Sequence, residues 1–147
     1  MISVLPRQFD NNYQGRRISL YVFYLITLMT LVRSLIHLLS SDGGAQSIAS
    51  IPLDQYSEHA ANGIITVFSL WGLSQLIMAI FYVIISLKYK SMVPLMYIFL
   101  IIEYVGRALI GISKPLYTLE TPPGAWLNLI FIASLPILFY FSIKPRK

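Results

Sequence analysis

The chain has 147 residues, of which 56% are hydrophobic and 12% are charged, and its formal net charge is +5. A length of this order predicts one domain, and a mean hydropathy of +0.69 lies above the usual range of soluble proteins. Four long apolar stretches make up most of the sequence, and a soluble core of this size could not bury them all. The composition therefore excludes an ordinary soluble domain. It predicts an all-α fold, an integral membrane four-helix bundle surrounded by the lipid bilayer.

We expect membrane spans over about 18–40, 63–87, 92–112 and 125–143. The first span follows two arginines, as the apolar core of a signal peptide would. It runs for 22 residues, from Ile18 to Leu39, whereas such a core has about 7–15 residues. The sequence therefore predicts an uncleaved first span.

The connections 41–62 and 113–124 are expected on the outer side of the membrane. The first contains the turn signal Asp42-Gly43-Gly44, and Pro52 is expected to start a helix that leads into the second span. Prolines stiffen the second connection, so we expect an ordered lid there.

The basic residues predict an orientation in the membrane and not a nucleic-acid partner. Cytoplasmic segments of membrane proteins carry an excess of Lys and Arg. Here eight of the eleven basic residues lie at the N-terminus, in one short turn or at the C-terminus, namely Arg7, Arg16, Arg17, Lys88, Lys90, Lys144, Arg146 and Lys147. These positions predict that both termini are cytoplasmic.

Charged and polar side chains inside the spans mark the candidate site. Glu103 and Arg107 lie in the third span, four positions apart and on one helical face. An ionised side chain at the centre of a span costs about 2.5–3.5 kcal/mol on insertion scales, so such residues usually have a function. With a rise of about 1.5 Å per residue, the other spans place polar or aromatic groups at a similar outer-half depth: Arg33, His37, Trp71, Gln75 and Asn128.

Two interpretations of this polar layer stay open. In the first, it lines a small cavity that opens outward, where two arginines outnumber one carboxylate and favour an anionic or lipophilic, quinone-like ligand. In the second, the layer is structural. Glu103 then bridges Arg33 and Arg107, while His37, Gln75 and Asn128 form hydrogen bonds between helices and fix their register.

Metal and cofactor sites are not indicated by the sequence. The chain has no cysteine, which excludes disulfides, thiolate catalysis and iron–sulfur ligation. His37 and His59 are the only histidines, and neither is spaced from another ligand as HxxxH or ExxH motifs require. We therefore expect no metal and no cofactor.

Four short spans with both ends inside, a first span that ends in Arg33-Ser34-x-x-His37 and a third that contains Glu103-x-x-x-Arg107 together resemble, in architecture over the whole chain and without a diagnostic motif, small DoxX-like bacterial membrane proteins. This resemblance implies a four-helix bundle with a polar interior in the bacterial inner (cytoplasmic) membrane. Some members of that group are associated with quinone-linked oxidoreductase complexes. The resemblance implies no catalytic residue.

Three functions are consistent with these observations. The first is a ligand-binding or accessory subunit, with a membrane protein partner or a second copy of the chain. The second is a small membrane enzyme with His37 and Glu103 as acid and base, acting on an anionic or quinone-like substrate. The third is a small oligomeric transporter, because four spans are few for alternating access within one chain.

Overall fold

The structure is a computed structural model that describes residues 2–146. Across these residues the fold is all-helical, with four α-helices that are each long and apolar enough to span a membrane. This confirms the predicted fold class at that level. The helices are α1 (Arg17–Leu39), α2 (Glu58–Lys88), α3 (Val93–Ser113) and α4 (Pro123–Ile143), with the short 3₁₀ helices η1 (Leu53–Gln55) and η2 (Lys90–Met92).

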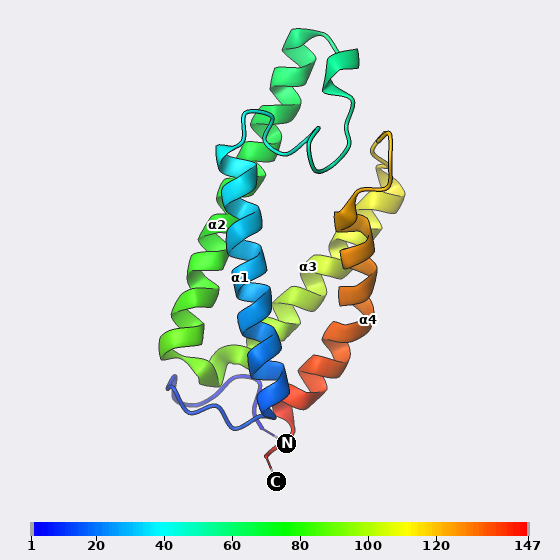
Figure 1. The fold of residues 1–147 in the computed structure, drawn as a ribbon. Coiled ribbons are helices and arrows are strands. Elements are labelled where there is room, and N and C mark those ends of the chain that lie inside the picture. Colours follow the sequence, from blue (N-terminus) through cyan, green and yellow to red (C-terminus); the bar gives the residue numbers. More distant parts are fainter. Residues whose placement is uncertain (1, 147) are drawn as a thin grey trace.

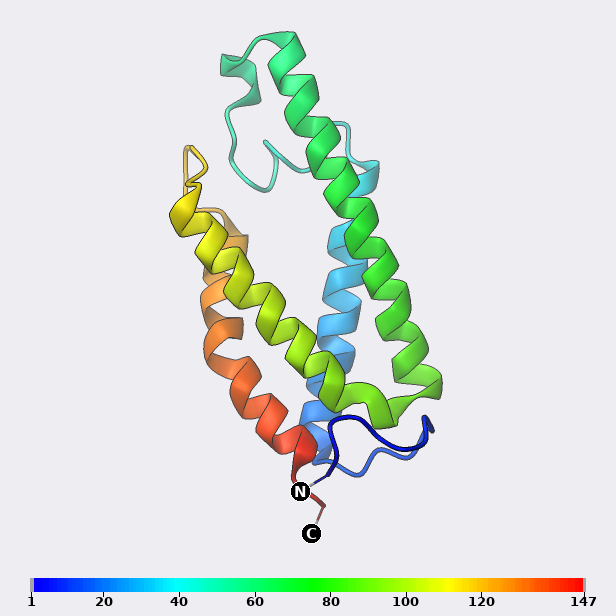
Figure 2. The same cartoon turned by 180° about the vertical axis from the view of Figure 1, so that it is seen from behind.

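The four helices form two antiparallel hairpins. Helix α1 packs mainly against α2, and α3 packs mainly against α4. The hairpins lie close together at the end that holds both termini and diverge toward the opposite end (Figures 1 and 2). We call these the terminal end (residues 2–16, 89–92 and 144–146) and the far end (residues 40–57 and 114–122).

The main apolar core fills the half of the bundle next to the terminal end. Phe23 of α1 contacts Tyr82 of α2 edge to face, with ring centroids 5.5 Å apart, and its ring lies 6.1 Å from that of Tyr97 of α3. All three side chains are almost completely buried. The core thus joins the two hairpins at the terminal end, while their divergence leaves room for cavities nearer the far end.

A close approach between α1 and α2 depends on Gly72. A Cβ atom at this position would lie 2.7 Å from the Cβ of His37 and 3.0 Å from the His37 carbonyl carbon. Ala79, two turns further along α2, is also fully buried. These small residues of α2 therefore allow close packing against α1, and they hold His37 at the helix interface.

Helix α2 is longer than the span expected from the sequence. It starts at Glu58 and not near residue 63, and its 31 residues give a length of about 46 Å, against about 30 Å for the apolar layer of a membrane. Pro52 does not start this helix, because η1 and Tyr56 intervene. The Ser57 hydroxyl instead caps α2 by accepting a hydrogen bond from the Ala60 N–H (3.4 Å).

The connection from α1 to η1 is an ordered turn built on Asp42. Its carboxylate accepts hydrogen bonds from the backbone N–H groups of Gly44 (2.9 Å), Gln46 (3.1 Å) and Ser47 (2.7 Å). Gly43 and Gly44 have φ angles of 59° and 73°, in the left-handed region that favours glycine. The turn predicted at Asp42-Gly43-Gly44 is thus confirmed.

The same turn carries apolar side chains onto α2. Ala45, Ile51 and Leu53 are buried together and pack against side chains of α2 that include Ile64 and Phe68. The second far-end connection is joined to this turn, because the Leu119 N–H donates to the Ser50 carbonyl (2.9 Å). The two hairpins are therefore connected at the far end by their loops.

Candidate functional site

A chain of polar side chains joins the two hairpins at the level of the predicted polar layer. Arg33 donates from Nη2 to Gln75 Oε1 (2.7 Å), and Gln75 donates from Nε2 to Glu103 Oε1 (3.1 Å). Glu103 in turn forms a salt bridge with Arg107, one turn further along α3. Arg33 is therefore linked to Glu103 through the Gln75 amide, whereas the structural interpretation of the sequence expected Glu103 to bridge both arginines.

Trp71 lies against both arginines. The guanidinium carbons of Arg33 and Arg107 are 5.6 Å and 5.0 Å from its ring, within the range of cation–π interactions. The centroid of the His37 ring is 4.6 Å from that of Trp71. Trp71 of α2 thus contacts a cation and an imidazole from α1 and a second cation from α3.

These groups border a cavity of about 550 Å³ between the hairpins, which we call the far-end cavity. All four helices and the Asp42 turn contribute to its wall, which is mostly apolar. Arg33, His37, Arg107 and Asn128 are the predicted site residues that line it, whereas Gln75 and Glu103 are not among the lining residues. Both arginines therefore contact the cavity, whereas the counter-ion Glu103 does not.

Two buried polar atoms at this site have no hydrogen-bond partner among residues 2–146. They are Arg33 Nε and Asn128 Oδ1. A buried polar group without a partner costs about 1–3 kcal/mol, and such groups in native structures usually bind water or a ligand. Asn128 lines the cavity from α4, so its amide is placed to bind a molecule that occupies this space.

His37 is held by the far-end turn. Its Nδ1 lies 2.8 Å from the Gly43 carbonyl oxygen, and the residue is only 3% exposed. Glu103 instead binds Gln75 and Arg107. The two residues predicted as acid and base thus belong to separate groups of contacts, and their catalytic role stays a prediction.

Sequence reasoning did not identify several residues of the cavity wall. Tyr104, which does not line this cavity, was also missed: its ring lies 5.3 Å from the Arg107 guanidinium, and an aromatic residue three positions before an arginine in a span could have indicated this contact. The contribution of the turn, through Ile48 and Ala49, depends on how the loop folds back over α2, and local sequence carries no signal for that.

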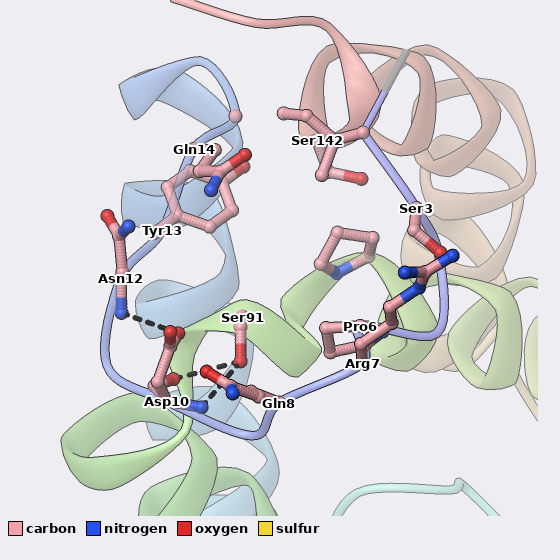
Figure 3. A pocket seen from close by; sticks show the side chains of 13 residues that line it. Ser3, Pro6, Arg7, Gln8, Asp10, Asn12, Tyr13, Gln14, Ser91 and Ser142 are labelled. Atoms are coloured by element: carbon pink, nitrogen blue, oxygen red, sulfur yellow. Dashed lines mark hydrogen bonds between the residues drawn. The ribbon is translucent and has the colours of Figure 1, made fainter.

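A second cavity, of about 400 Å³, lies at the terminal end beneath the N-terminal segment (Figure 3). There the Asp10 N–H donates to Ser91 Oγ (3.0 Å), and Ser91 Oγ donates to the Asp10 carbonyl (2.9 Å). The Asp10 carboxylate accepts from the Asn12 N–H (3.0 Å). These polar groups attach the N-terminal segment to the bundle, so the far-end cavity is the stronger candidate for a ligand site.

The fold and the site define an all-helical protein with two apolar hairpins joined by a charged layer. Among residues 2–146, no three His, Asp or Glu side chains gather as a metal ion would require. Comparison of the chain with protein-family models finds no match, and comparisons with curated proteins and with solved structures find none either. The resemblance to DoxX-like proteins stays a prediction.

Proposed function

We propose that this chain is a multi-pass protein of the bacterial inner membrane, with its terminal end in the cytoplasm. Four helices of sufficient length and apolarity support membrane insertion. The orientation is supported by the basic residues, because seven of the ten within residues 2–146 lie at the terminal end or at the adjoining helix ends, while Asp42, Asp54 and Glu58 lie toward the far end.

Single cysteines test this orientation on a chain that contains none. Asn11→Cys at the terminal end and Gln55→Cys at the far end both replace exposed residues. A membrane-impermeant maleimide added to intact cells should label only Gln55→Cys, and both variants should react after the cells are opened. Labelling of Asn11→Cys in intact cells would overturn the proposed orientation.

We further propose that the protein binds an anionic ligand in the far-end cavity, as a ligand-binding or accessory subunit of the membrane. The observation that carries this proposal is that Arg33 and Arg107 line one largely apolar cavity while Glu103 lies behind them. The three charges sum to +1, and an apolar wall strengthens the attraction for an anion because it excludes water. Guanidinium groups bind carboxylates and phosphates with paired hydrogen bonds.

Trp71 provides a reporter for this binding. The chain has two tryptophans, and Trp126 is 63% exposed on α4, so Trp126→Phe leaves a single indole beside both arginines. Titration with methyl phosphate should change its fluorescence with a saturating curve. Arg107→Gln should weaken this binding at least tenfold, whereas Arg17→Gln, which changes an exposed arginine at the start of α1, should not affect it. Equal binding by the two variants, or no binding by the parent protein, would overturn the proposal.

The alternatives of a membrane enzyme and of an oligomeric transporter stay predictions, as do a protein partner and a second copy of the chain. The contacts of His37 with Gly43 and of Glu103 with Arg107 hold both side chains in place. Side chains held in fixed positions are sufficient for a binding site, which favours ligand binding over the alternatives.

A further inference from the structure

We infer that the ligand is a single-chain lipid with an anionic head group. The head group would bind at Arg33 and Arg107, and the chain would lie in an apolar crevice between α1 and α4. This inference rests on the anion site proposed above and adds the class of ligand.

The crevice is a separate cavity of about 410 Å³. Its wall is formed by α1, α4, Tyr104 of α3 and Ile48 of the far-end turn. Arg33 and Ile48 line both this crevice and the far-end cavity, so the two spaces adjoin at the Arg33 side chain.

The crevice offers an acyl chain an almost wholly apolar wall. On α1 this wall includes one hydroxyl side chain, that of Thr30. Its hydroxyl donates to the Ile26 carbonyl (2.8 Å), so its hydrogen bond is already formed within the helix. Val32 and Leu127, from the two helices that border the crevice, are 49% and 37% exposed. In a bilayer these side chains would contact lipid, so a chain could enter from the side.

The direction of the crevice matches that of a lipid. Along α1 the wall runs from Ile36 past Arg33 to Ile26, so most of it lies on the terminal-end side of Arg33. Arg33 lies six residues before the last residue of α1, or about 9 Å along the axis, and Ile26 lies about 10 Å further in by the same rise. A lipid in the far-end leaflet likewise has its head group near the surface and its chain toward the middle.

The number of acyl chains in the ligand follows from the cavities around the arginines. Another apolar cavity next to α1 lies between Tyr24, Leu31 and Leu87. It shares Leu28 with the crevice but, in the described part of the chain, no lining residue with the far-end cavity that contains both arginines. One crevice that adjoins the arginines predicts one chain. The adjoining head-group cavity is mostly apolar and is lined by two cations, one of which, Arg33, has an Nε–H donor without a partner among residues 2–146, so the complement is an anion with acceptor oxygens.

The test compares ligands and variants in phosphatidylcholine bilayers, with Trp71 fluorescence in the Trp126→Phe background as the readout. Dodecyl phosphate and dodecanoate supply an anionic head with a chain, dodecanol supplies a chain without charge, and methyl phosphate supplies the charge alone. Val32→Phe with Leu127→Phe fills the crevice. The matched control, Val67→Phe with Leu70→Phe, adds the same rings to an exposed face of α2, where the parent residues are 64% and 59% exposed.

We expect the filled crevice to weaken the binding of dodecyl phosphate or dodecanoate at least tenfold and to leave methyl phosphate binding unchanged. Partitioning into the bilayer is the same for all variants, so it cancels in this comparison. Equal binding of the chain ligands to the filled and control variants would overturn the inference, and so would dodecanol binding as well as the anions. Methyl phosphate binding in those cases would show that the anion site itself stands, whereas its absence would show that the site proposal had failed.

Discussion

The close contact at Gly72 gives a quantitative prediction about the α1–α2 interface. Gly72→Ala places a Cβ atom 2.7 Å from the His37 Cβ and 3.0 Å from the His37 carbonyl carbon. Because one of these atoms belongs to the backbone, relief requires the helices to separate. Overpacking of this kind costs about 1–3 kcal/mol, and the helical gain of alanine over glycine offsets about 0.5–1 kcal/mol. We therefore expect a net loss of about 0–2.5 kcal/mol in the free energy of unfolding.

The matched control is Gly106→Ala on α3, where a new Cβ would have no heavy atom within 4 Å outside its own helix. It should be neutral or stabilising by up to about 1 kcal/mol. The assay is unfolding by added denaturing detergent in mixed micelles, followed by circular dichroism. The reasoning would be refuted if Gly72→Ala were as stable as Gly106→Ala, because the α1–α2 contact would then be looser than the structure has it.

Three further predictions concern polar contacts. Glu103→Gln leaves Arg107 without its counter-ion. Because these side chains are about one quarter exposed, the free energy of unfolding should fall by about 1–3 kcal/mol, less than the roughly 3–5 kcal/mol of fully buried pairs. The same unfolding assay measures this loss. Burial raises the pKa of Asp42 but the three backbone N–H groups lower it more, so its pKa lies below the ordinary value of 3.8. The stability that Asp42 provides is then complete above pH 3.8 and lost as the pH falls through its lower folded pKa, and Asp42→Asn should remove this acid-dependent part of an unfolding profile. Ser57→Ala should destabilise α2 by about 0.5–1 kcal/mol and increase hydrogen exchange at Ala60, whereas unchanged exchange there would contradict the cap.

The helices could be predicted from sequence because their signal is local. Each apolar stretch exceeds what a membrane span needs, and this holds without any knowledge of its neighbours. The start of α2 could not be predicted in this way. Glu58 and Asn62 are polar and Gly63 weakens a helix, so the sequence indicates a loop where the Ser57 cap lets the helix begin early.

The candidate site was predictable in composition but not in its pattern of contacts. Depth along each span was enough to group Arg33, Glu103 and Arg107 in one layer. The choice of Gln75 as the link between Arg33 and Glu103 depends on the rotation of α2 and the crossing of two hairpins, and helical periodicity sets neither. The same limit applies to the crevice, whose α4 wall is set by the angle at which the hairpins diverge.

The division of the polar chain between the hairpins also bears on how the protein is made. The Arg33–Gln75 bond lies within the first hairpin and the Glu103–Arg107 pair within the second, so each hairpin brings its own partner for its buried cation. With the membrane location proposed above, the first hairpin would enter the bilayer during synthesis with Arg33 already hydrogen-bonded to Gln75, before the second hairpin has been translated. The Gln75–Glu103 bond remains to be formed when the two units meet. Association of the hairpins then becomes a late and separable step of biogenesis, in which the Gln75–Glu103 bond forms together with the contacts between the hairpins at both ends of the bundle.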